Sequence, residues 1–99
     1  MLPKIQNLKM GDQINVSRYS PYGVLQRMVV TTVPQTMSAI TYVYKLALDL
    51  PDGTYIAIER NNKIDMYRIY DTADGKEVRF IPNFKPWTRR TEKKRKMLR

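Results

Sequence analysis

The sequence predicts an all-β fold, a small antiparallel barrel of six strands. Residues 41–84 alternate short apolar runs with the turn sequences PDG, NN and ADG, which is typical of consecutive β-hairpins. A Ser-Pro-Tyr-Gly turn at 20–23 and the break at Pro34 divide the preceding residues in the same way. With 99 residues and no clear long helix, an SH3-like barrel is favoured over an OB-like one.

The first two strands are expected on either side of the turn at 20–23. Residues 13–19 alternate apolar and polar side chains, which places Ile14, Val16 and Arg18 on one face. The second strand is rich in β-branched residues and ends at Pro34, because proline lacks the N–H that a central ladder needs. Its far half is apolar on both faces, so we expect a strand that is covered on both sides.

Residues 37–50 fit two structures. As a helix, they place apolar side chains along one stripe, with Thr36 or Ser38 as the N-cap. As a strand, they alternate apolar and polar positions from Ile40 to Leu50. The alternation is the more regular pattern, and the β-branched and aromatic residues at 41–44 are poor helix formers. The sequence therefore favours a strand, with at most a short helical turn near 36–40.

The remaining strands are expected at 55–60, 63–71 and 76–81. Asn61 and Asn62 suit a two-residue hairpin, because asparagine tolerates positive φ better than most residues. Prolines at 82 and 86 end the regular pattern. The expected domain therefore covers residues 1–84, and residues 85–99 form a basic tail with too few apolar residues to fold alone.

The composition argues against an enzyme, a metal site and a cofactor. The chain has no His and no Cys, which removes the commonest general base, metal ligand and nucleophile. Asp12, Asp52 and Asp74 lie in expected turns, where aspartate serves local hydrogen bonding. No run approaches the ~20 apolar residues of a membrane span, and no secretory signal pattern is seen, so we expect an intracellular protein without a membrane partner.

The charge is concentrated at one end of the chain. Residues 85–99 contain eight basic residues and one acidic residue, so this segment carries +7 of the net charge of +9. Such asymmetry indicates a polyanionic partner, since phosphates would neutralise these side chains and release counterions. A solvated solubility tail, a nuclear-localisation cluster and an RNA-binding segment are the alternatives. The primary nucleic-acid-binding candidates are Arg89, Arg90, Lys93, Lys94, Arg95 and Lys96.

A second set of candidates comes from the folded body, where arginine and tyrosine are interleaved. Aromatic side chains flanked by cations bind nucleic acids on many barrels, although cross-strand Tyr–Arg pairs also stabilise sheets without a ligand, and this structural use is preferred. Trp87 either anchors the tail to the barrel or stacks on bases. The second set comprises Arg27, Lys45, Arg60, Arg68, Arg79 and Tyr67.

These observations predict a non-enzymatic nucleic-acid-binding protein, with double-stranded DNA favoured over RNA or single-stranded DNA. The size and basicity would suit a viral or phage accessory protein, with a nucleoid-associated cytoplasmic location, or a nuclear one in a eukaryotic host. The alternative is an adaptor that binds an acidic surface on a host enzyme, ribosome or polymerase, because acidic proteins also attract cations. An edge strand would allow two copies to pair as a dimer.

Overall fold

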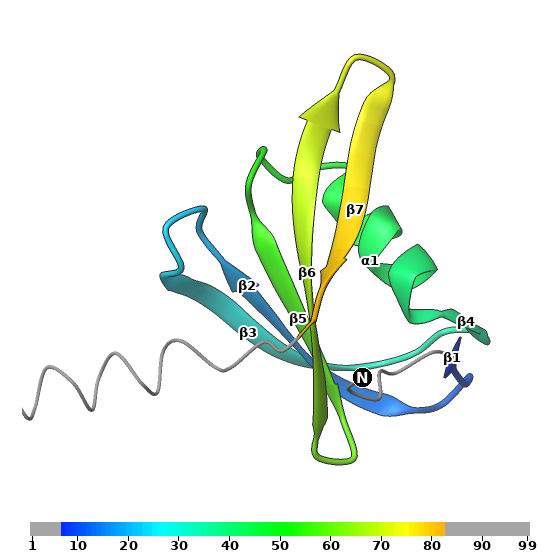
Figure 1. The fold of residues 1–99 in the computed structure, drawn as a ribbon. Coiled ribbons are helices and arrows are strands. Elements are labelled where there is room, and N and C mark those ends of the chain that lie inside the picture. Colours follow the sequence, from blue (N-terminus) through cyan, green and yellow to red (C-terminus); the bar gives the residue numbers. More distant parts are fainter. Residues whose placement is uncertain (1–6, 83–99) are drawn as a thin grey trace, which may run out of the picture.

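One antiparallel sheet curves around a single helix in this computed structural model, which describes residues 7–82 (Figure 1). The five main strands lie in the order β3-β2-β5-β6-β7, and every neighbouring pair is antiparallel. A separate two-stranded ladder joins β1 to β4. The elements are β1 Asn7–Leu8, β2 Gln13–Tyr19, β3 Leu25–Thr32, β4 Met37–Ser38, α1 Ala39–Ala47, β5 Tyr55–Arg60, β6 Lys63–Thr72 and β7 Gly75–Ile81.

The predominance of β structure is confirmed, but a closed barrel is not found. Within residues 7–82 the sheet is open, and β3 and β7 form its two edges. The predicted SH3-like barrel is therefore unconfirmed. The final meander has three strands, β5 to β7, because its predicted first strand is a helix.

The favoured strand over 40–50 is wrong, since residues 39–47 form α1 and residues 48–50 form the turn after it. Ser38 caps the helix by accepting a hydrogen bond from the backbone N–H of Thr41 at 3.2 Å. A stripe of small buried residues, Ala39, Val43 and Ala47, lets the helix lie close to the sheet. The alternation that favoured a strand comes from two other sets of apolar side chains. Within each set the residues are spaced by four along α1 and the turn after it, and together the two sets occupy every second position. One is exposed (Ile40, Tyr44, Leu48), and the other lies beside a cleft (Tyr42, Leu46, Leu50).

The expectation that the second strand is covered on both faces is also wrong. β3 is an edge strand, and its Met28 and Val30 side chains are 60% and 65% exposed. Valine favours β-strands at the edge of a sheet as well as in its centre, so a run of valines does not indicate that a strand is buried. The predicted pairing of two copies through an edge strand could involve β3 or β7 and stays a prediction.

The turns follow the sequence closely. Asn61 and Asn62 have φ of 52° and 67° and join β5 to β6 as a two-residue hairpin. The predicted turn at 51–53 is present, although it joins α1 to β5 and not two strands. Gly53 is buried there with a φ of 85°, and a Cβ at this position would lie 3.1 Å from Pro21.

The main core lies between α1 and the sheet face that points toward it, which we call the inner face. Because α1 packs mainly over β6 and β7, the β2–β3 half of the inner face is less covered. The opposite, outer face carries a smaller cluster of Tyr19, Ala57 and Met66. The main core contains Leu8, Ile14, Val33, Ala39, Val43, Ala47, Ile56, Ile58, Tyr67 and Ile69.

Candidate functional site

Two pairs of arginines lie directly opposite each other in neighbouring strands. Arg18 in β2 is opposite Arg27 in β3, and Arg68 in β6 is opposite Arg79 in β7. The first pair lies on the inner face, because Arg18 is also opposite the core residue Ile56. The second pair lies on the outer face. We call them the inner pair and the outer pair.

Arg68 of the outer pair is held by its neighbours. Its Nε donates to the carbonyl oxygen of Gly53 at 3.2 Å. Its guanidinium carbon lies 4.5 Å from the ring centroid of Tyr55 and 5.4 Å from that of Tyr70. These contacts are cation–π interactions, which stabilise the sheet without any ligand.

Arg79, the other member of the outer pair, is more exposed but also has partners. It forms an ion pair with Glu77 at 2.7 Å, and its guanidinium lies 4.6 Å from the centroid of the Tyr70 ring. The hydrogen bond with Glu77 raises the pKa of Arg79, and the same bond lowers the pKa of the Glu77 carboxyl. The outer pair therefore presents charge at the surface from side chains whose positions are fixed.

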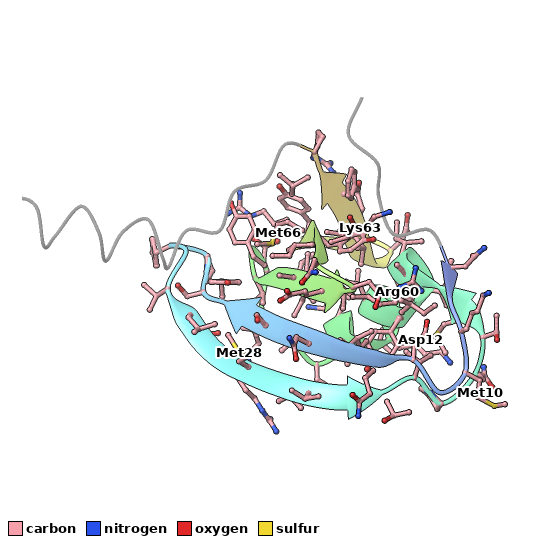
Figure 2. The ribbon with its side chains drawn as sticks, turned by 90° about the horizontal axis from the view of Figure 1, so that it is seen from below. Met10, Asp12, Met28, Arg60, Lys63 and Met66 are labelled. Carbon is pink, nitrogen blue, oxygen red and sulfur yellow. The ribbon has the colours of Figure 1, made fainter. Side chains whose placement is uncertain are left out.

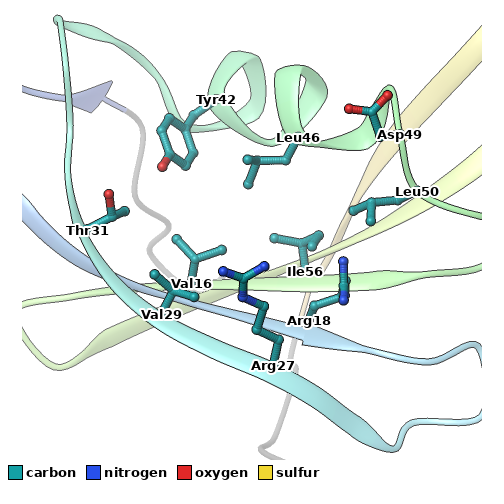
Figure 3. Close-up of a pocket in the computed structure, with 10 residues that line it drawn as sticks. All are labelled: Val16, Arg18, Arg27, Val29, Thr31, Tyr42, Leu46, Asp49, Leu50 and Ile56. Atoms are coloured by element: carbon teal, nitrogen blue, oxygen red, sulfur yellow. The ribbon is translucent and has the colours of Figure 1, made fainter.

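The inner pair lies in a cleft between the β2–β3 half of the sheet and α1 (Figure 3). The cleft has a volume of about 390 Å³, within the usual range of small-molecule sites. Tyr42 and Leu46 extend from the helix toward the valine and isoleucine side chains of the sheet, and both guanidinium groups lie on the sheet side. The complete lining is Val16, Arg18, Arg27, Val29, Thr31, Tyr42, Leu46, Asp49, Leu50 and Ile56.

The inner pair lacks the partners that the outer pair has. Among the described residues, neither Arg18 nor Arg27 forms an ion pair, and the Nε atom of Arg18 is buried with no hydrogen-bond partner. Asp49, the acidic residue of the lining, lies on the helix side of the cleft (Figure 3). A buried donor without an acceptor is costly, so the described residues leave Arg18 incompletely satisfied.

The side chain of Arg60 is held by hydrogen bonds within the fold. Its guanidinium donates to Asp12 Oδ2 at 2.9 Å and to the carbonyl oxygen of Asn7 at 2.6 Å, and it lies beside Asp12 in Figure 2. The backbone N–H of Lys9 donates to the same carboxylate oxygen at 2.9 Å. This backbone hydrogen bond and Arg60 together lower the pKa of Asp12. Arg60 thereby fastens the segment before β2 to the end of β5.

The other predicted body residues lie apart from one another. Lys45 is exposed in the last turn of α1. Tyr67 is only 2% exposed, packs edge-on against Phe80 and donates its hydroxyl to Asp65 at 3.2 Å. Burial and the Asp65 carboxylate raise the pKa of Tyr67, so this phenol stays neutral. Its ring is therefore a core element and offers no exposed face for stacking.

The candidates at the end of the chain lie outside the described residues: Trp87, Arg89, Arg90, Lys93, Lys94, Arg95 and Lys96. Arg18, which the structure places in the cleft, was not among the predicted binding residues. Its signal was present in the sequence, because Arg18 continues the apolar face of Ile14 and Val16. A charged residue at an inward position of a strand requires a partner, and this is the rule that would have found it.

Within residues 7–82, acidic side chains do not gather in groups of three or more that could hold a metal ion. No helix in that part of the chain has the length and apolar character needed to cross a membrane. No protein-family model, curated protein or solved structure matches the chain.

Proposed function

We propose that this chain is a non-enzymatic nucleic-acid-binding protein whose cationic segment, residues 85–99, contacts phosphates. The observation that carries the proposal is the separation of charge. Residues 7–82 contain nine basic and eight acidic residues and are nearly neutral, whereas the cationic segment carries +7. Contacts to phosphate release condensed counterions, so affinity of this kind is strongly salt-dependent and largely independent of sequence.

The outer pair supports the proposal as an adjacent contact surface. Lys85 follows Arg79 by only six residues, so the chain keeps the start of the cationic segment within about 20 Å of the outer pair. A guanidinium that stacks on a tyrosine ring still has N–H groups at its edge for phosphate oxygens. Arg68 and Arg79 thus add fixed cations on the sheet to those of the segment that supplies most of the charge.

The experiment is a salt titration of the full chain with random duplex DNA, single-stranded DNA and RNA. If about six side chains contact phosphates, the slope of log K against log salt on duplex DNA should be about −5. The variant Lys93→Gln/Lys94→Gln should make this slope less steep by about two. Duplex DNA is expected to bind at least as tightly as the two single-stranded ligands.

The matched control is Lys9→Gln/Lys63→Gln, which removes the same two charges from exposed positions of the body. This control should leave the slope within experimental error of the parent chain. Equal effects of the two variants would show that only net charge matters and would overturn the role of the cationic segment. Absence of binding to all three ligands at about 50 mM salt would favour the alternative, an adaptor for an acidic protein surface.

A further inference from the structure

The inner pair combines two unfavourable features. Arg18 and Arg27 are directly opposite in the β2–β3 ladder, where like charges repel. In addition, the Nε atom of Arg18 is buried and has no acceptor among the described residues. One anionic group would relieve the repulsion, because a phosphate or carboxylate can accept hydrogen bonds from two guanidinium groups at once.

The rest of the cleft is suited to apolar atoms. Val16, Val29 and Ile56 line it from the sheet, while Leu46 and the ring of Tyr42 line it from α1 (Figure 3). Burial raises the pKa of the Tyr42 phenol, so this side chain adds no charge of its own. Thr31, Tyr42 and Asp49 are the remaining polar groups.

We propose that this cleft binds a small amphiphilic anion, a molecule with one phosphate or carboxylate head and an apolar body about the size of an octyl chain. The head group lies between Arg18 and Arg27, and the apolar body lies between Leu46 and the valines of β2 and β3. Apolar contact supplies much of the affinity of such a ligand, and the guanidinium groups fix its orientation. A nucleotide fits less well, because few polar groups of the lining would meet the edge of its base.

This site is separate from the proposed nucleic-acid interface. The inner pair faces α1, whereas the outer pair lies on the opposite face of the sheet. Asp49 lies on the helix side of the same cleft. Its carboxylate would repel an anionic head group, so removal of this charge should strengthen binding.

The experiment is calorimetric titration of the full chain with octyl phosphate, octanoate, octanol and inorganic phosphate. Octyl phosphate and octanoate should each bind at least about tenfold more tightly than octanol or inorganic phosphate, because only they offer both the charge and the apolar body. Arg18→Met and Arg27→Met should each weaken octyl phosphate binding at least about tenfold. Asp49→Asn should strengthen it.

Two controls separate this site from general attraction to a basic protein. Lys63→Met removes one charge from an exposed position and should leave octyl phosphate binding unchanged. Lys93→Gln/Lys94→Gln should also leave it unchanged while reducing the salt dependence of DNA binding, so the two proposals succeed or fail independently. Equal affinity for octyl phosphate and octanol would overturn the proposed site, as would wild-type affinity in Arg27→Met. Because Arg27 is exposed, a loss of binding in this variant is not explained by misfolding.

Discussion

The inner and outer arginine pairs have the same cross-strand arrangement in the sheet, but they differ in the groups that surround them. Each pair occupies directly opposed positions on two neighbouring strands. Arg68 and Arg79 have a carbonyl oxygen, a carboxylate and two tyrosine rings as partners. The inner pair has apolar neighbours, and a nitrogen atom of Arg18 is buried without an acceptor.

This difference separates two kinds of arginine pair in a sheet, one that its neighbours satisfy and one that they do not. Where neighbouring groups satisfy the guanidinium groups, the pair stabilises the fold, and a ligand is not needed. Where they do not, the pair costs stability. Stability measurements on matched substitutions can therefore separate the two roles.

The largest expected effect is the loss of stability in Arg68→Met. This substitution removes the hydrogen bond to the Gly53 carbonyl and the two cation–π contacts with Tyr55 and Tyr70. We expect a loss of about 2 kcal/mol in the free energy of unfolding, measured by urea denaturation. The corresponding decrease in Tm is about 10 °C for a domain of this size.

Arg79→Met is the comparison within the outer pair. Arg79 is exposed and loses only a surface ion pair and one ring contact, so its effect should be smaller than that of Arg68→Met. If Arg68→Met were as stable as the parent chain, the outer pair would not be held by its partners. The two pairs would then not differ in their contribution to the free energy of unfolding in the way expected here.

The inner pair should respond in the opposite direction. Arg18→Met removes the unsatisfied Nε and the repulsion from Arg27, and its thioether side chain retains apolar contact with the cleft. We expect a gain of about 1 kcal/mol in the free energy of unfolding in the absence of ligand. Urea denaturation of the variant and the parent chain measures this gain.

Octyl phosphate should reduce or reverse the stability advantage of Arg18→Met over the parent chain, which provides a further check. A saturating concentration of octyl phosphate should stabilise the parent chain more than Arg18→Met, because the variant binds this ligand more weakly. Arg27→Met should give a smaller gain without ligand, since Arg27 is exposed and only repulsion is relieved. A loss of stability in Arg18→Met would mean that its guanidinium is already satisfied within the protein.

The sequence predicted the strands that local rules determine. β2 and β5 begin and end where the alternation does, and the Asn61-Asn62 turn adopts the positive φ values expected of it. These features depend on residues that are neighbours in the chain. Prediction failed for 39–47, where stripes spaced by four residues combine into an apparent alternation. The buried stripe of Ala39, Val43 and Ala47 is small in volume and was outweighed by the larger exposed side chains.

The candidate sites were predicted less well, because they depend on strand order. The sequence identified Arg27 and Arg68 as candidates but contained no information that they face opposite sides of the sheet. The cleft forms where α1 leaves the β2–β3 half of the sheet open, and that arrangement depends on long-range packing. Burial of Tyr67 likewise depends on β7, which places Phe80 beside its ring.

The smallest expected effect concerns Arg60, an arginine whose partner is a carboxylate. The backbone hydrogen bond from Lys9, together with Arg60, lowers the pKa of Asp12 below that of the unfolded chain. A group of this kind contributes stability above its unfolded pKa of about 3.9, and the contribution disappears as the pH falls through the folded pKa. Asp12→Asn should therefore be less stable than the parent chain at pH 7, and the difference should vanish in strong acid.

Thermal unfolding between about pH 7 and pH 2 measures this difference. Asp74→Asn is the matched control, because it removes the same charge from an exposed turn and so measures the effect of net charge alone. Over most of this range the loss in Arg68→Met should stay constant, since Arg68 is satisfied by a carbonyl group and two neutral rings. A pH-independent loss in Asp12→Asn would show that the folded chain does not favour the ionised form of the Asp12 carboxyl group.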